Sequence, residues 1–201
     1  MILYGASGHA KVIMEILEDC GDTVSALWDD AEKPDIRGLK VQQPVLAGNG
    51  DDAVIISVGN NHIRKKIAAK LAGLFHFEKA IHPRSIVSKT AIIGEGTVIM
   101  GGATINADSN IGSHCIVNTN AVVDHDCVLE DYVHISPNAT LCGNVQVGEG
   151  THIGAGATVI QGISIGRWCM IGAGAVVIRD IPDHVTAVGN PTYILNTVNQ
   201  E

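Results

Sequence analysis

One histidine in the chain is followed directly by a carboxylate, within the stretch Val-Asp-His125-Asp126-Cys. A carboxylate beside an imidazole orients the ring and raises its basicity, which is what a general base needs near neutral pH. Neighbouring side chains on a flat strand point in opposite directions, so the pair works only if the chain turns there. We therefore predict His125 as a catalytic base supported by Asp126; the alternative is an ordinary surface histidine.

Three loops near the N-terminus carry groups suited to a nucleotide. The segment Gly5–His9 lies between an apolar run and a helix pattern, so its backbone N–H groups and the helix end could hold a phosphate. It lacks a complete G-x-G-x-x-G pattern, which argues against NAD. Asp29 and Asp30 could accept hydrogen bonds from a ribose or a uracil ring, and Gly59 follows a third apolar run. Turns without any ligand are the alternative.

Two histidines are spaced so that they could share a metal ion. His134 and His152 are eighteen residues apart, three units of the repeat described below, which would align them on adjacent coils. His114 falls at a different position of the repeat. Because two aligned histidines do not complete a zinc site, we expect no metal.

Composition limits the classes of protein. The 201 residues are 46% hydrophobic but only 3% aromatic, so a core must be built from small aliphatic side chains. The formal charge of -8 disfavours binding to nucleic acid or to an anionic membrane surface. Five cysteines without C-x-x-C spacing indicate reduced, packing thiols. With no signal-peptide pattern and no long apolar run, we expect a soluble, cytoplasmic protein.

A six-residue repeat dominates the second half of the chain. From Ile81 to Val177 every sixth residue is Ile, Val or Leu, and four positions later the residue is always small or aliphatic. This period suits short flat strands joined by tight corners, with three sides to a triangular coil and stacked coils about 4.8 Å apart. Three cysteines, Cys115, Cys127 and Cys169, occupy the small inward column. We predict a parallel β-helix of between five and six coils.

The region before the repeat has the pattern of a small parallel sheet. We expect strands at 2–4, 23–28 and 53–58 and helices at 10–20 and 62–71. Ligands of such α/β sheets lie at the carboxyl ends of the strands. We predict a Rossmann-like βαβ domain at residues 1–78, a β-helix domain at 79–182, and a tail at 183–201 that is irregular or partly helical.

Several short motifs make the chain similar to one known family. The repeat resembles the left-handed parallel β-helix of hexapeptide-repeat acyltransferases, and Tyr4–Lys11, Val58–Lys66, Ile105–Ala107, Val117–Thr119 and Val123–Cys127 resemble motifs of bacterial sugar O- and N-acyltransferases of the NeuD/PglD/PerB type. The resemblance covers nearly the whole chain. It implies a homotrimer, with acetyl-CoA lying between neighbouring β-helices and the active site at the subunit interface.

The resemblance also implies roles for individual residues. His125 matches the catalytic base, Asp126 its acidic partner, and Asn118 a residue near the sugar amine. The residues that match the family's nucleotide-sugar loops are Ser7, Gly8, His9, Asp29, Asp30 and Gly59. Those that match its acetyl-CoA cleft are His134, Gly143, Ala155 and Ala173. The backbone N–H of Gly143 would stabilise the oxyanion.

One segment departs from the family. Members often carry Gly-Val-Pro-Ala-Lys near the end, where this chain has Gly-Asn-Pro-Thr-Tyr at 189–193. Arg167, Arg179 or a neighbouring subunit would then have to contact the nucleotide end of CoA.

The sequence thus predicts acetyl transfer from acetyl-CoA to the 4-amino group of a nucleotide-linked 4-amino-4,6-dideoxy sugar, most simply a UDP sugar, in bacterial surface glycan biosynthesis. The base itself does not distinguish this from O-acetylation of a sugar such as a sialic acid. More distant alternatives are a metal-dependent hydratase of the γ-carbonic anhydrase type and a β-helix that serves only as an assembly platform.

Overall fold

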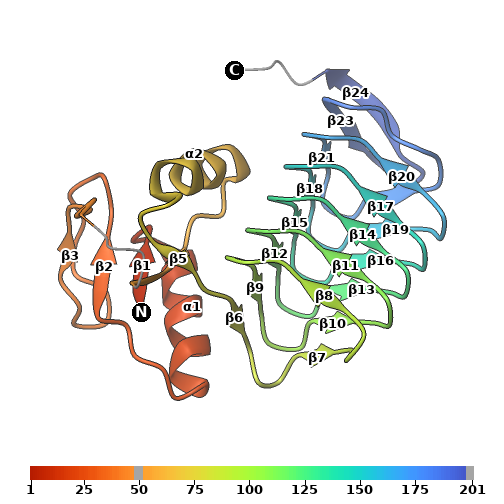
Figure 1. Cartoon of the computed structure of the whole chain (residues 1–201). Helices are drawn as coiled ribbons and strands as arrows, with labels where there is room; N and C mark the ends of the chain where they lie inside the picture. The colour runs from red at the N-terminus through yellow and green to blue at the C-terminus, as the bar shows by residue number, and fades with distance from the viewer. Residues whose placement is uncertain (48–51, 198–201) are drawn as a thin grey trace.

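The computed structural model describes residues 1–47 and 52–197, which form an α/β domain and a long triangular solenoid (Figure 1). The elements of the first domain, in chain order, are β1 (Ile2–Tyr4), α1 (Gly8–Asp19), β2 (Ala26–Trp28), β3 (Val41–Gln42), β4 (Ala53–Ile56), α2 (Asn61–Leu71) and β5 (His76–Phe77). The five strands pair in parallel in the order β3-β2-β1-β4-β5. The direction of winding reverses between β1 and β4, so the loops after these two strands open side by side.

The predicted strands and helices of this domain are present, with different ends. The first helix begins at Gly8 rather than residue 10, because Ser7 takes the extended N-cap conformation. The second strand is shorter than 23–28, and the third ends at Ile56. The short strands β3 and β5 had no apolar pattern long enough to predict them.

The solenoid consists of three sheets that wind around one core, and their strands are parallel except for the last one. The eight-stranded sheet contains β6 (Ala80–Ile81), β9 (Val98–Ile99), β12 (Ile116–Val117), β15 (His134–Ile135), β18 (His152–Ile153), β21 (Met170–Ile171), β23 (Val185–Val188) and β24 (Tyr193–Thr197). The six-stranded sheet contains β7 (Ile86–Val87), β10 (Thr104–Ile105), β13 (Val122–Val123), β16 (Thr140–Leu141), β19 (Thr158–Val159) and β22 (Val176–Val177). The five-stranded solenoid sheet contains β8 (Ile92–Ile93), β11 (Asn110–Ile111), β14 (Val128–Leu129), β17 (Gln146–Val147) and β20 (Ser164–Ile165).

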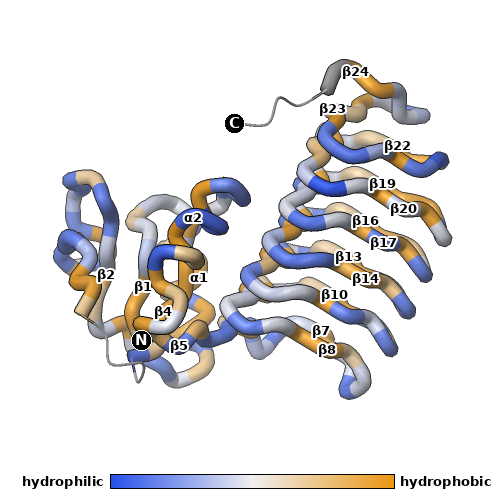
Figure 2. The backbone as a smooth tube through the Cα atoms, turned by 45° about the horizontal axis from the view of Figure 1, so that its top comes forward, coloured by the Kyte–Doolittle hydropathy of each residue, from blue (hydrophilic) through white to orange (hydrophobic). Residues whose placement is uncertain are grey.

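The corners between these sheets repeat as regularly as the strands. Every sixth residue from Gly96 to Gly174 has a positive φ, between 53° and 73°. Gly, Asn and Asp adopt this left-handed conformation at least cost, and they occupy most of these positions. Hydrophilic residues gather at the corners (Figure 2). The repeat therefore specifies a turn at each corner as well as an inward side chain on each strand.

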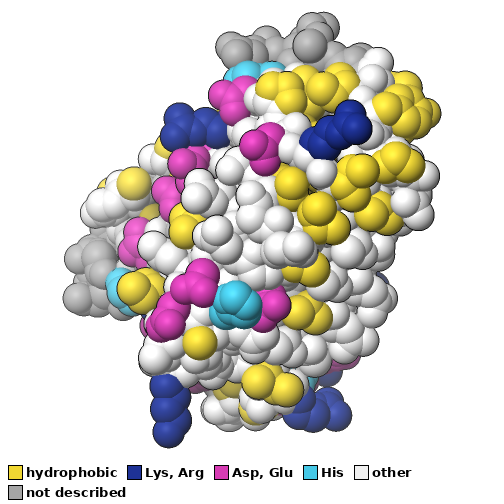
Figure 3. Space-filling view, turned by 90° about the vertical axis from the view of Figure 1, so that its right-hand side faces the viewer, with side chains coloured by type: hydrophobic (Ala, Val, Ile, Leu, Met, Phe, Trp, Pro, Cys, Tyr) yellow, Lys and Arg dark blue, Asp and Glu magenta, His cyan; other side chains and the backbone are white. Residues whose placement is uncertain are grey.

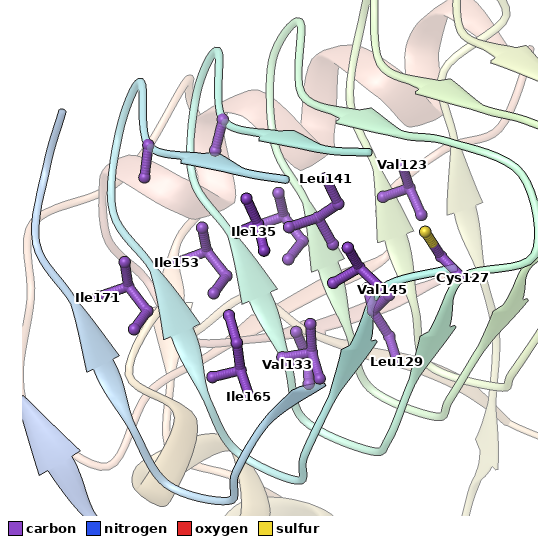
Figure 4. Packing of buried hydrophobic residues seen from close by; sticks show 14 of the residues in the cluster. Val123, Cys127, Leu129, Val133, Ile135, Leu141, Val145, Ile153, Ile165 and Ile171 are labelled. Carbon is purple, nitrogen blue, oxygen red and sulfur yellow. The ribbon is translucent and has the colours of Figure 1, made fainter. Parts of the chain in front are cut away.

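The interior of the solenoid is a stack of aliphatic side chains (Figure 4). Those shown include Val123, Leu141 and Ile153, all fully buried and one hexad or more apart. Cys115, Cys127 and Cys169 are buried among them, as predicted from the small inward column. Burial raises the pKa of the Cys115 thiol to about 12, so this group is inert packing.

The end of the chain differs from the prediction of an irregular or partly helical tail. β23 extends the eight-stranded sheet by pairing in parallel with β21, and β24 pairs with β23 in the antiparallel direction. Val185 and Ala187 are buried and alternate with the partly exposed Thr186 and Val188, so one face of β23 packs against the core. The β-helix thus continues past residue 182 as sheet, because its last coil leaves strand edges that the following segment covers.

The α/β domain docks against the eight-stranded sheet. Ile13 and Met14 of α1 share an apolar cluster with Val98, Met100 and Ile116 of the solenoid. On the other side α2 contacts the solenoid corners, where the His62 ring stacks on Trp168 at 4.1 Å and Lys65 pairs with Glu149. Neither described helix is long and apolar enough to cross a membrane.

Arg64 joins the two parts at the centre of this interface. It is only 1% exposed, and burial lowers the pKa of its guanidinium to about 10, which leaves it charged at neutral pH. Its donors bond the carbonyls of His114 (2.7 Å), Val58 (3.0 Å), Gly59 (3.2 Å) and Tyr132 (2.8 Å) and the side chain of Asn61 (2.7 Å). The loop after β4 is thereby fixed to two solenoid coils.

Candidate active site

The predicted base and its partner meet at a corner between β13 and β14. His125 Nδ1 lies 2.7 Å from Asp126 Oδ2, and both side chains are more than half exposed. Asp126 has a φ of 58°, so the left-handed turn brings the two neighbouring side chains to the same outward side. The Asp126 hydrogen bond, with the charge of Asp124 beside it, raises the pKa of His125. With Nδ1 held by the carboxylate, Nε2 is free to accept a proton.

A second carboxylate orders this corner and was not singled out from the sequence. Asp124 Oδ1 accepts hydrogen bonds from the backbone N–H of His125 at 2.8 Å and from Asn106 Nδ2 at 2.7 Å. These two hydrogen bonds lower the pKa of Asp124, and the bond from Asn106 has the larger effect. Asn106 lies one coil below, at the corner after β10. The eighteen-residue spacing between Asn106 and Asp124 was the sequence signal that could have indicated this contact.

Gly143 lies directly against the imidazole. It occupies the same corner one coil above, and a Cβ placed there would come within 2.5 Å of Cε1 and 2.6 Å of Nε2 of His125. Because Gly143 has no side chain, the imidazole ring of His125 can pack over its backbone. An open depression of about 460 Å³ surrounds the two residues and is also lined by Asp124, Cys142, Asn144, Gln161 and Gly162.

A second group of predicted residues surrounds His134 on the eight-stranded sheet. His134 is 8% exposed, its Nε2 is 3.2 Å from Asn118 Nδ2, and its ring stacks on His152 at 4.4 Å. Burial, and then His152, hold the pKa of His134 far below its usual value, so it is neutral. Within the described part of the chain, its buried Nδ1 has no hydrogen-bond partner.

The loops of the α/β domain reach the same region. His9 is largely buried, its pKa is lowered to about 4 chiefly by burial, and its buried Nε2 finds no partner among the described residues. Ser7 caps α1 through its backbone only, leaving its hydroxyl uncommitted to the helix. No atom lies within 4 Å of a Cβ built on Gly8 or Gly59, so the space above the ends of β1 and β4 is open.

The two aspartates after β2 are already engaged within the domain. Asp29 accepts hydrogen bonds from the backbone N–H groups of Ala6 (2.8 Å) and Ala31 (3.0 Å). Asp30 accepts from the Tyr4 hydroxyl at 2.8 Å and pairs with Lys70 at 3.2 Å. Asp29 therefore shapes the loop after β1, and its contact with a nucleotide stays a prediction.

Ala155 and Ala173 are exposed at another corner, which joins the eight-stranded and six-stranded sheets. Each stands two residues after its strand, β18 and β21, and these strands are neighbours in register.

The predicted residues thus form two groups in one chain. His125, Asp126 and Gly143 lie at the corner of the triangular section opposite the eight-stranded sheet. Asn118, His134, Ala155 and Ala173 lie on or beside that sheet, and the predicted nucleotide loops belong to the α/β domain that docks against it.

The aligned histidines stack on each other, and no third ligand joins them in the part of the chain that the structure describes. His152 Nε2 is 2.7 Å from the Ser136 hydroxyl, and the described residues contain no cluster of three or more His, Cys, Asp or Glu side chains that could hold a metal ion. His114 stacks instead on Tyr132 at 5.3 Å.

Comparison with known proteins identifies both parts of the chain. The model of the PglD N-terminal domain matches residues 1–71, and the model of the bacterial transferase hexapeptide (six repeats) matches residues 144–179. UDP-N-acetylbacillosamine N-acetyltransferase of Bacillus subtilis (strain 168) is 48% identical over 107 residues, which is 49% of this chain and 50% of that protein. The alignment therefore spans about half the length of this curated relative.

Solved structures match over almost the whole chain. A histidine-to-asparagine variant of perosamine N-acetyltransferase from Caulobacter crescentus, in complex with CoA and GDP-perosamine, is 41% identical with a TM-score of 0.93, covering 97% of this chain and 96% of that one. The acetyltransferase domain of PglB from Neisseria gonorrhoeae FA1090, with acetyl coenzyme A, is 40% identical with a TM-score of 0.89, covering 96% and 98%.

These matches confirm the predicted fold class, a small parallel-sheet domain followed by a left-handed β-helix of hexapeptide repeats, and the predicted acyltransferase class. The chain belongs to the acetyl-CoA-dependent sugar N-acetyltransferases that combine a PglD-type N-terminal domain with a hexapeptide-repeat β-helix.

Proposed function

We propose that this protein transfers the acetyl group of acetyl-CoA to the 4-amino group of a nucleotide-linked 4-amino-4,6-dideoxy sugar, in bacterial surface glycan biosynthesis. The observation that carries the proposal is the His125–Asp126 pair at 2.7 Å, with Gly143 against the imidazole. Relatives that match the whole chain bind CoA together with a nucleotide amino sugar. We take UDP as the nucleotide, following the curated relative, with GDP and dTDP as alternatives.

The geometry supports direct transfer without a covalent enzyme intermediate. Nε2 of His125 removes a proton from the amine as its nitrogen attacks the thioester carbonyl. A C–N bond forms, the C–S bond breaks, and the proton passes from the imidazolium to the departing thiolate of CoA. The backbone N–H of Gly143 is the donor for the developing oxyanion.

The positions of the two groups of residues favour a site shared between subunits. The base lies across the solenoid from the loops proposed to hold the nucleotide sugar, so one chain does not bring them together. A cyclic trimer joins different faces of neighbouring chains, and would place His125 of one subunit beside Asn118, His134, Ala155 and Ala173 of the next. Exposed Ile86, Ile92, Val128 and Ile178 are apolar surface suited to such an interface. Figure 3 shows hydrophobic side chains gathered on the face of the molecule that it presents.

The proposal is tested by thiol release from acetyl-CoA with a panel of acceptors. UDP-, GDP- and dTDP-linked 4-amino-dideoxy sugars are compared with N-acetylneuraminate as the hydroxyl acceptor. Rapid release with one amino sugar is expected, and it also identifies the nucleotide. Release with N-acetylneuraminate alone would assign O-acetylation instead, and no release with any acceptor would contradict acetyl transfer to these substrates.

The pH dependence of turnover should depend on Asp126. The base acts in its neutral form, so kcat/KM rises with pH through the pKa of His125, which the Asp126 hydrogen bond raises. In Asp126→Asn the pKa falls, and the rising limb of the profile is expected to move to lower pH while the plateau rate decreases. A limb that stays in place would show that Asp126 does not tune the base.

A further inference from the structure

CoA carries three phosphate groups, whereas the β-helix has few cations to meet them. Between residues 90 and 201 the sequence contains two basic residues besides histidine, Arg167 and Arg179. Anionic groups at a protein surface are bound chiefly by Arg, Lys and backbone N–H groups. Beyond the first coil, which carries Arg84 and Lys89, these two arginines are therefore the side chains of the solenoid to consider for the nucleotide end of CoA.

Arg167 is committed elsewhere. Its Nε and Nη2 bond the two carboxylate oxygens of Glu130 at 3.0 Å and 3.2 Å, a two-point ion pair that neutralises the guanidinium. It also stands at the corner between the five-stranded solenoid sheet and the eight-stranded sheet, which is not the corner of His125. Binding a phosphate there would require breaking this pair.

Arg179 stands on the same corner as the base. β13, β16, β19 and β22 are neighbours in register in the six-stranded sheet, and the residues two places after these strands are His125, Gly143, Gln161 and Arg179. Three strand spacings, roughly 14 Å in total, separate His125 from Arg179. An extended pantetheine arm, from the thioester sulfur to the pyrophosphate, has about that length.

The Arg179 guanidinium is also available. The residue is exposed, and no ion pair or side-chain hydrogen bond engages it within residues 1–47 and 52–197. Its neighbour Asp180 is not paired with it in the described structure, and Asp180 Oδ1 accepts the backbone N–H of Ser164 at 2.8 Å. From His125 through Gly143 to Arg179, the column therefore runs from a thioester site to an unpaired cation; on the other side of His125 it continues to Lys89, two coils away.

We propose that Arg179 binds the pyrophosphate of acetyl-CoA and sets how tightly this chain holds the nucleotide end of the donor. The inference rests on the proposed transfer from acetyl-CoA, with the pantetheine arm lying along the corner from Gly143 past Gln161. Arg179 is a binding residue, and it takes no part in moving protons.

The test compares Arg179→Gln with the wild type, and Lys40→Gln serves as the control because Lys40 is an exposed cation of the α/β domain and lies outside this column. We expect Arg179→Gln to raise the KM for acetyl-CoA roughly 10-fold, the value of one charge-assisted hydrogen bond to a buried or bound anion. The kcat at saturating acetyl-CoA and the KM for the amino sugar should not change, and Arg179→Lys should recover part of the affinity.

Truncated donors locate the contact. The penalty of Arg179→Gln should persist with acetyl-dephospho-CoA, which keeps the pyrophosphate, and disappear with acetyl-pantetheine, which lacks it. Loss of the penalty with acetyl-dephospho-CoA would move the contact to the 3′-phosphate and overturn the assignment. An unchanged KM for acetyl-CoA, or an equal penalty with acetyl-pantetheine, would overturn it as well.

Calorimetric binding of CoA in the absence of acceptor separates this inference from the proposed function. Wild-type binding together with tenfold weaker binding by Arg179→Gln supports the pyrophosphate contact. Equal binding by the two proteins rejects that contact and leaves acetyl transfer intact, whereas absence of binding by the wild type would reject both.

Discussion

Replacing His125 by alanine is expected to lower kcat by roughly 10²- to 10⁴-fold, the usual contribution of a general base. The substitution removes the group that accepts the amine proton and returns it to the thiolate, and leaves the corner backbone in place. Because the side chain is more than half exposed, the melting temperature should stay near that of the wild type. The rate of thiol release with acetyl-CoA and the preferred amino sugar measures the effect.

His76→Ala is the matched control, since His76 is an exposed histidine on β5 and lies in the α/β domain. It should retain wild-type turnover. Near-normal turnover by His125→Ala, with the acceptor and donor both saturating, would remove His125 from the mechanism and leave attack by the free amine without a protein base.

Replacing Arg64 by methionine is expected to destabilise the protein by about 3 kcal/mol or more, because the buried carbonyls and the Asn61 side chain that it bonds lose their donor. The loss combines a weaker α2 with a weaker contact between the α/β domain and the solenoid. Since the same side chain holds the backbone of Val58 and Gly59, the KM for the nucleotide sugar should rise as well.

Lys66→Met on the same helix is the control, because Lys66 is exposed and makes no described ion pair. Denaturant unfolding of the two variants gives the difference in free energy, and steady-state kinetics gives the KM. If Arg64→Met unfolds at the wild-type denaturant concentration, the interface does not depend on this guanidinium. Arg64→Lys should fall between them, since an ammonium group offers fewer donors in a different geometry.

The solenoid was predictable because one short rule repeats many times. Each hexad specifies an inward aliphatic residue and a corner, so errors at single positions do not obscure the pattern, and Ile81 to Val177 could be placed correctly. The tail was not predictable in the same way. β23 and β24 form because the last coil presents unpaired strand edges, which is information that the local sequence of residues 183–197 does not carry.

In the candidate site, too, some features could be predicted from the sequence and others could not. The His125–Asp126 contact could be anticipated from adjacency, but it depended on a turn, which the left-handed φ of Asp126 supplies. Arg64 was not singled out from the sequence, since a buried guanidinium that bonds five partners looks in sequence like a solvent-exposed one. The separation of the base from the sugar loops likewise required the three-dimensional positions of the sheets.

The most direct test of the account mixes two variants, each expected to be inactive, in the proposed trimer. His125→Ala keeps the sugar loops, and Gly59→Trp keeps the base but fills the open space above β4 with a bulky side chain. If the site is shared between subunits, mixed trimers purified through two different tags should recover roughly a third of the wild-type rate, because one interface in three then pairs an intact base with intact loops. Mixed trimers no more active than either parent would contradict a site assembled from two chains.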